Sequence, residues 1–348
     1  MDIATRLTLF SLLALPVLSS AHHSIAGNYD PDIIVEVEGE VTDVLWRNPH
    51  VQVSMRVISD DGDGQLWEMA MDSVSNMRRW KIDPSFIEVG DRIRVAGDLA
   101  RRVENSLYIR NILTSSGEEV VLGMQTQARW SGPTIEIAEN RRLGIGDTSA
   151  PELGIFRVWD TPGNSTRFLQ RDYGQTEAGR ANLTPQALAA FDAFVWERDN
   201  PLKDCALKGM PLIMESPYPA EFTQAGEDIV WRIEEYDTVR TIHMAPDAEA
   251  RQPSLLGYSV GRWEDDRTLV VTTTQMGWGH FDGQGIPLST EAVAEERFAL
   301  SPQGDRLDYT MRLTDPETFI EPRVLSKHWV WFPDAEVAVY DCSRAAED

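Results

Sequence analysis

The stretch Leu307-Asp308-Tyr309-Thr310-Met311-Arg312-Leu313 indicates the fold of the C-terminal half of this 348-residue chain. Apolar and polar side chains alternate along it, which predicts a β-strand with one face on a core and the other in water. Short polar turns separate it from similar segments on either side. Together these segments are 229–235, 239–244, 257–263, 269–275, 292–300, 307–313, 323–332 and 336–340. Strands joined mainly by hairpins predict a lipocalin-like antiparallel meander barrel.

One helix is expected ahead of this barrel. Thr184 is its predicted N-cap and Pro185 its first residue, because a hydroxyl caps the free N–H groups and proline fits the first turn. The helix should end before Asn200-Pro201. The barrel domain with its helix is therefore placed at 183–348. The Gly-, Pro-, Ser- and Asn-rich stretch 123–182 is predicted to be a linker and entry segment.

The segment 22–122 predicts a second, smaller β domain. Strands are expected at 33–46, with Gly39 allowing a bend, and at 50–57, 66–71, 92–97 and 107–113. A short helix over 73–81 falls between the third and fourth strands. Three strands, a helix and two strands is the order of an OB-fold, a partly open five-stranded barrel. The chain as a whole is therefore predicted to be mainly β.

Residues 1–21 have the features of a secretory signal peptide. Arg6 supplies the positive start, 7–18 form a short apolar run, and Ser19-Ser20-Ala21 is a small-residue cleavage site. The apolar run is too short to cross a bilayer, and no later segment is long enough either. We therefore expect an exported, periplasmic protein without stable membrane insertion. A retained N-terminal anchor is the alternative.

The net charge of −24 argues against nucleic-acid partners, because phosphate contacts require clustered Lys and Arg. No nucleotide cofactor is expected either, since the sequence contains no Walker motif and no dinucleotide fingerprint. The partners that remain are a metal ion or a small molecule. The sequence leaves the oligomeric state open.

Cys205 and Cys342 are the two cysteines of the chain. An oxidising compartment favours pairing them, and we expect a disulfide that ties the end of the chain to the start of the second domain. Two separate buried thiols are the alternative.

The histidines of the first domain suggest a metal site. Cleavage after Ala21 exposes His22 with both an α-amine and an imidazole, and these nitrogens favour copper, with zinc as the alternative. Cleavage one residue earlier would leave Ala21-His22-His23, in which the third residue is a histidine that also allows Cu(II) binding. His23 follows directly, and His50 could complete the site if its face of the barrel meets the N-terminus. A solvated tail with uninvolved histidines is the competing interpretation.

A second candidate site is predicted in the C-terminal barrel. An enzyme for a small, partly apolar substrate would use His/Arg/carboxylate chemistry there. Its expected catalytic residues are His243, Arg240, His280 and Asp282, and its expected ligand-binding residues are Tyr258, Trp263 and Trp278. A histidine in a strand is also commonly a hydrogen-bonded wall residue. A third reading is a non-catalytic accessory or assembly protein that uses exposed aromatic side chains.

Several motifs resemble families of exported proteins. Residues 21–120 resemble an uncharacterised family of bacterial periplasmic domains, on the motifs Ala21-His22-His23-Ser24, Gly39-x-Val41, Asn48-Pro49-His50 and Gly90-Asp91-x-x-x-Val95-x-Gly97. Residues 150–345 resemble an uncharacterised exported β-rich family, on segments such as 235–244, 254–264 and 296–298, Asp315-Pro316, and both cysteine contexts. That family often has Pro-His-Ser where this chain has Pro287-Leu288-Ser289. Neither resemblance implies a reaction.

Overall fold

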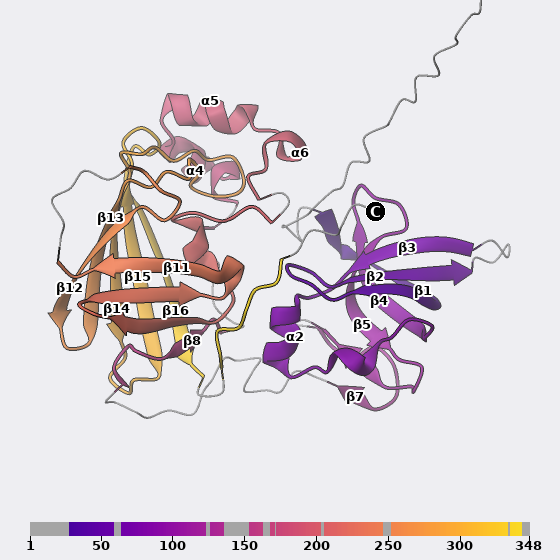
Figure 1. Cartoon of the computed structure of the whole chain (residues 1–348). Coiled ribbons are helices and arrows are strands. Elements are labelled where there is room, and N and C mark those ends of the chain that lie inside the picture. Colours follow the sequence, from indigo (N-terminus) through magenta and orange to yellow (C-terminus); the bar gives the residue numbers. More distant parts are fainter. Residues whose placement is uncertain are drawn as a thin grey trace, which may run out of the picture.

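The computed structural model describes residues 28–58, 64–122, 126–135, 153–162, 168–170, 172–202, 205–245, 252–332 and 335–342. These residues form two β-rich units, a smaller N-terminal one and a larger C-terminal barrel (Figure 1). The mainly β fold predicted from residue alternation is confirmed.

The N-terminal sheet has the connectivity of an OB-fold. Its strands run in the order β3-β2-β1-β4-β5-β6-β7, and β3 also pairs with β5 in parallel at Ala70 and Tyr108, so that β1 to β5 close on themselves. Their bounds are β1 (Tyr29–Leu45), β2 (Gln52–Ile58), β3 (Gly64–Ala70), β4 (Arg92–Ala100), β5 (Leu107–Leu113), β6 (Glu119–Val121) and β7 (Thr134–Ile135). The predicted helix is α2 (Val74–Trp80), between β3 and β4, and a 3-10 turn, η1 (Pro84–Phe86), follows it. Ser73 caps α2 by accepting a hydrogen bond from the backbone N–H of Asn76 at 3.0 Å.

The long strand β1 requires a glycine where it crosses β2. A Cβ at Gly39 would lie 2.3 Å from the carbonyl oxygen of Arg56, closer than any side chain can approach. The register with β2 then shifts between Val41 and Asp43. Such a bulge increases local strand twist, and it lets one strand serve both halves of the small barrel.

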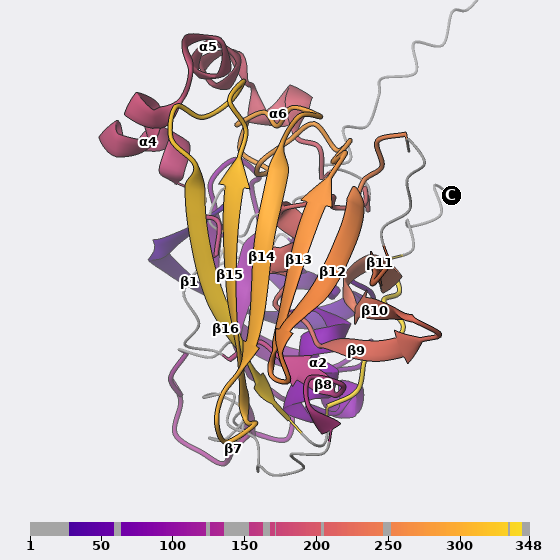
Figure 2. The same ribbon diagram turned by 90° about the vertical axis from the view of Figure 1, so that its left-hand side faces the viewer.

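The C-terminal unit is a closed barrel of nine strands among the described residues. Figure 2 shows the long strands β12 to β16 side by side. The strands are β8 (Val158–Asp160), β9 (Ala220–Ala225), β10 (Asp228–Ile233), β11 (Thr238–His243), β12 (Tyr258–Asp265), β13 (Thr268–Thr274), β14 (Val293–Leu300), β15 (Arg306–Thr314) and β16 (Arg323–Trp331). Neighbours pair antiparallel except β11 and β12, which pair in parallel over two residue pairs.

The strand list differs from the prediction at both ends of the barrel. Residues 335–342 form no strand, because the backbone N–H groups of Ala338 and Tyr340 donate to the carboxylates of Glu234 and Asp237 instead of to a neighbouring strand. The short strands β8 and β9 close the barrel in their place. Strand β8 lies in the stretch 123–182 that was predicted to be a linker.

The interior of the barrel is packed with side chains. Leu307, Tyr309, Met311 and Leu313 are buried, as their alternation predicts. Aromatic rings pack across the barrel in edge-to-face and tilted pairs, between Phe222, Trp231, Phe298, Tyr309 and Trp329. Each large side chain removed from water contributes about 2 kcal/mol or more, so this cluster contributes substantially to the stability of the barrel.

Short helices cover one end of the barrel (Figures 1 and 2). They are α4 (Glu177–Asn182), α5 (Pro185–Ala193) and α6 (Trp196–Asp199), with the 3-10 turns η3 (Tyr173–Gln175), η4 (Leu212–Glu215) and η5 (Glu235–Asp237) elsewhere in the domain. Thr184 caps α5 and Pro185 opens it, as predicted. The helix ends at Ala193, earlier than expected, and α6 follows after a break.

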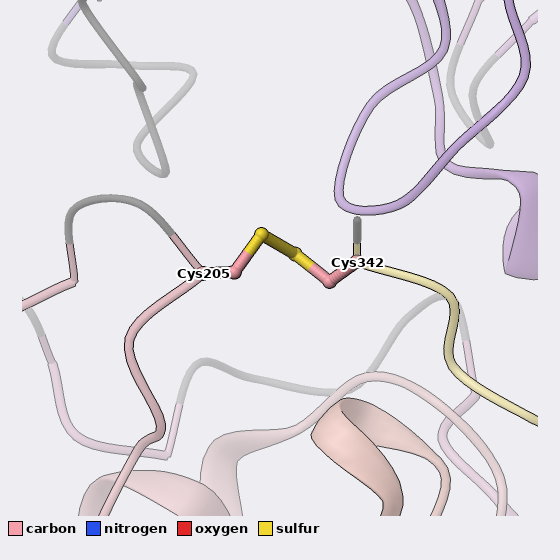
Figure 3. The surroundings of a disulfide bond; sticks show 2 residues. All are labelled: Cys205 and Cys342. Carbon is pink, nitrogen blue, oxygen red and sulfur yellow. A yellow bond between two sulfur atoms is a disulfide. The ribbon is translucent and has the colours of Figure 1, made fainter. Parts of the chain in front are cut away.

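The two domains meet where α2 faces the barrel. Arg79 donates to Asp160 and to the carbonyl oxygen of Pro217, each at 2.7 Å. The C-terminal segment, yellow in Figure 1, passes between the domains. The disulfide between Cys205 and Cys342 anchors this segment (Figure 3) and confirms the predicted pairing across 137 residues.

Candidate functional site

The Asn48-Pro49-His50 segment lies in the loop between β1 and β2, at the junction of the domains. The buried Asn48 donates from its backbone N–H to the carbonyl oxygen of Asp341 at 2.9 Å. Its side chain exchanges two hydrogen bonds with Ser75 of α2, at 3.0 and 3.3 Å. The loop that carries His50 is therefore fixed to α2 and to the C-terminal segment.

One nitrogen of His50 is held and the other is available. Its Nδ1 lies 3.2 Å from the carbonyl oxygen of Met71. A carbonyl oxygen only accepts, so Nδ1 carries the hydrogen and Nε2 presents its lone pair. Burial lowers the pKa of His50 to about 4, so the imidazole is neutral at neutral pH. A neutral imidazole with a fixed tautomer is the form in which histidine binds metals.

Aromatic side chains connect His50 to the start of β1. The ring of Tyr108 meets the His50 ring edge to face at 5.7 Å, and Tyr29, the first residue of β1, packs on Tyr108 at 5.5 Å. Asp72 follows Met71, and burial raises the pKa of its carboxyl while a hydrogen bond from Asn76 opposes the shift. The described surroundings of His50 are therefore aromatic and polar.

The other two predicted ligands, His22 and His23, lie outside the described residues. Within the described residues, no group of three His, Cys, Asp or Glu side chains is placed to hold a metal ion. The described part of the chain thus supplies His50 to the predicted site.

A cleft of about 440 Å³ opens on the flank of the barrel, where β11 meets β12 in parallel. It contains three of the residues predicted for the barrel site, Arg240, His243 and Tyr258. Among the described residues, its lining is Val239, Arg240, Thr241, His243, Gln252, Ser254, Leu256, Gly257, Tyr258 and Ser259. The rings of His243 and Tyr258 lie face against face with a tilt, 5.0 Å apart.

Arg240 is bound into a buried network inside the barrel. Its guanidinium pairs with both carboxylate oxygens of Glu296, and it also donates to the hydroxyls of Ser259 and Thr273. Tyr309 donates to Glu296 at 2.7 Å. Glu296 neutralises the positive charge of Arg240 within this network, so Arg240 does not present an unpaired cation to the cleft.

His243 has a carboxylate partner that sequence reasoning missed. Its Nδ1 lies 2.8 Å from Asp228, and the other oxygen of Asp228 accepts the backbone N–H of Met244 at 3.0 Å. The hydrogen bond from the Met244 amide lowers the pKa of Asp228 most, and the hydrogen bond from His243 lowers it further.

The turn between β10 and β11 explains why this partner was missed. A two-residue turn at 236–237 would place Val230 opposite His243. The wider turn around η5 shifts the register by two residues and brings Asp228 there instead.

The remaining predicted residues do not line the cleft. Asp282 is buried and accepts from the backbone N–H groups of Gln284 and Ile286, so it orders its own loop. His280 packs against Trp278 at 5.0 Å, and burial lowers the pKa of His280. Trp263 lies toward the far end of β12, 6.3 Å from Phe156. The structure thus groups Arg240, His243 and Tyr258 and leaves the other four apart from them.

The comparisons with known proteins concern the N-terminal part. Residues 11–106 match a family of unknown function, DUF6152. This agrees with an uncharacterised family over the first domain and brings no activity with it. No curated protein matches the chain.

Among solved structures, one similar chain is the dimeric N-terminal domain of the PriB protein from Thermoanaerobacter tencongensis. It is 16% identical, with 24% of this chain and 96% of that chain covered, at a TM-score of 0.19. A similarity at this level gives no information about function or fold. Among the helices of the described residues, none is both long and apolar enough to span a membrane.

Proposed function

We propose that this chain is an exported, periplasmic copper-binding protein in which His50 and the histidine-bearing N-terminus hold the metal. The observation that carries the proposal is the hydrogen bond from His50 Nδ1 to the Met71 carbonyl oxygen. It leaves Nε2 free to bind a metal, and a metal-bound histidine commonly donates its other ring N–H to a backbone carbonyl oxygen.

The position of His50 relative to the start of β1 supports the inclusion of the N-terminus. Tyr29 begins β1 and contacts Tyr108, which in turn contacts His50. Six peptide steps separate His23 from Tyr29, and they can span at most about 20 Å. His22 and His23 are therefore within reach of His50.

The chemistry of the donors favours copper. Imidazole nitrogens and a terminal amine are ligands for which Cu(II) has the highest affinity among the divalent first-row metals, and zinc is the alternative. Cleavage after Ala21 would supply the amine on His22. The Cys205–Cys342 disulfide is compatible with export to an oxidising compartment.

The test is copper binding by protein that begins at His22. Elemental analysis gives the stoichiometry, and the EPR spectrum of the Cu(II) form reports the number of nitrogen ligands. We expect His50→Gln to lower copper affinity at least tenfold and to change the EPR spectrum. The matched control is His280→Gln, which removes a partly buried histidine of the other domain.

Two results would contradict the proposal. The first is a His50→Gln protein that binds copper as tightly as the parent with the same spectrum, because the described part of the site would then be irrelevant. The second is protein from the native host that still carries Met1, because no histidine amine would then be exposed.

A further inference from the structure

The flank cleft of the barrel contains a hydrogen-bonded carboxylate–imidazole pair that the copper proposal does not use. Asp228 and His243 face each other across β10 and β11, with 2.8 Å between the Asp228 carboxylate and His243 Nδ1. His243 lines the cleft, and Asp228 stands behind it. The side chains of His243 and Asp228 are 25% and 31% exposed, so solutes can reach the imidazole.

The carboxylate fixes the tautomer of the neutral ring. One oxygen of Asp228 accepts the Met244 N–H at 3.0 Å, and the other accepts from His243. A carboxylate only accepts, so Nδ1 carries the hydrogen and Nε2 presents a lone pair. No described residue donates to Nε2. The tilted Tyr258 ring, 5.0 Å away, limits rotation of the imidazole.

The lining of the cleft disfavours anionic ligands. The charge of Arg240 is compensated by the buried Glu296, and His243 is paired with Asp228. The other lining groups of the described residues are hydroxyls, one amide, and the apolar side chains of Val239 and Leu256. The net charge of −24 further disfavours anions. A neutral molecule with an apolar body and a hydroxyl group matches this surface.

We propose that this cleft binds a small neutral hydroxyl compound of the phenol type, with its O–H directed to His243 Nε2. The aromatic body lies against Tyr258 and Leu256, and the hydroxyl donates to the imidazole. For an acidic phenol, the O–H bond breaks, its proton moves to Nε2 and the electron pair stays on the phenolate oxygen. Asp228 then stabilises the imidazolium through Nδ1–H. His243 is the proton acceptor, and Asp228 is a positioning residue.

The probe for this proposal is 4-nitrophenol, whose absorption spectrum distinguishes the phenol from the phenolate. Full-length mature protein is titrated with it at a mildly acidic pH, where the free compound is mostly protonated. We expect saturable binding together with growth of the phenolate band. His243→Gln should weaken binding about tenfold, the effect of losing one ligand hydrogen bond, and abolish the band.

Asp228→Asn separates positioning from direct contact. An amide has one accepting and one donating end, so it cannot accept from both the Met244 N–H and the His243 ring. If the amide oxygen at position 228 keeps accepting the Met244 N–H, its NH₂ group faces His243 Nδ1. The His243 ring must then change tautomer, and its Nε2 becomes a donor. We expect the phenolate band to disappear while the fold is retained, as checked by near-ultraviolet circular dichroism.

A third variant covers the case in which the pair matters only for folding. Thr241→Trp fills the cleft from an exposed lining position and leaves Asp228 and His243 intact. We expect it to abolish binding with unchanged stability, and His280→Gln to leave binding unchanged. Absence of saturable binding up to about millimolar probe would overturn the proposal, and so would parent-like binding by His243→Gln or Thr241→Trp. None of these readouts depends on copper.

Discussion

The backbone N–H of Asn48 donates to the carbonyl oxygen of Asp341 at 2.9 Å, so the loop before His50 is joined to the residue that precedes Cys342. The C-terminal segment is in turn held by the disulfide to Cys205, and its Tyr340 ring packs against Tyr218 and Tyr236 of the barrel. A single segment therefore connects the barrel to the His50 loop.

The Asn48 side chain should contribute to this junction. Asn48→Ala removes two buried hydrogen bonds with Ser75 and should lower the free energy of unfolding by about 2 kcal/mol. Urea denaturation measures the loss. In a double-mutant cycle with Ser75→Ala, the two losses should be less than additive, because both variants remove the hydrogen bond from Asn48 Nδ2 to Ser75 Oγ. Additive losses would mean that the pair is not coupled.

The disulfide should stabilise both the barrel and the junction. Its loop of 137 residues restricts the unfolded chain, which predicts a contribution of roughly 5 kcal/mol at most. The Cys205→Ser, Cys342→Ser double variant should unfold at lower urea concentration. Hydrogen exchange should also speed up at residues 338–341 and at Asn48. Unchanged exchange at Asn48 would show that the segment does not hold the loop.

The buried Arg240–Glu296 pair should respond asymmetrically to substitution. Arg240→Met leaves the Glu296 carboxylate buried with only hydroxyl partners, and a loss of about 3–5 kcal/mol is expected. Replacing both residues, with Glu296→Leu added, should cost less than Arg240→Met alone, because no charge is left unpaired. Thermal denaturation compares the variants. A double variant less stable than the single one would contradict this account.

The buried Lys327 should make stability depend on pH. Burial of its ammonium group lowers its pKa to about 7, and the group donates to the carbonyl oxygens of Met214 and Ser216. In the unfolded chain its pKa is near 10.4. Between these values the unfolded chain binds more protons, so its contribution to stability rises with pH from about 7 to about 10, by up to about 1.4 kcal/mol per pH unit.

Denaturation curves at several pH values from 6 to 9 measure this dependence. The matched variant Lys327→Met should have a flatter profile over the same range, because it removes the titrating group and keeps an apolar stem of similar length. Equal slopes in the two proteins would mean that Lys327 keeps an ordinary pKa in the folded state.

Local patterns in the sequence determined much of the fold. Alternation located the long strands β12 to β16, because a half-buried strand must repeat every two residues. Cap chemistry located the start of α5 at Thr184. The order of elements in the first domain predicted its OB-type connectivity. The cysteine count and the expected compartment predicted the disulfide.

The short strands and the site partners required long-range information. Strand β8 has three residues, too few for a periodic signal, and it is a strand only because β9 and β16 flank it. The segment 336–340 alternates like a strand, yet side-chain carboxylates take its N–H groups. Asp228 meets His243 through a register that a four-residue turn sets.

The sequence by itself thus determined the long strands, the cap of α5, the cysteine pairing and the set of candidate histidines. Only the tertiary structure decided which candidates meet: it placed His243 in a cleft with Asp228, enclosed Arg240 with Glu296, and left Asp282 to order a loop. The physical reason is that hydrophobic period and cap chemistry act over a few residues. Ring closure of the barrel and strand register, in contrast, depend on contacts between residues distant in the chain.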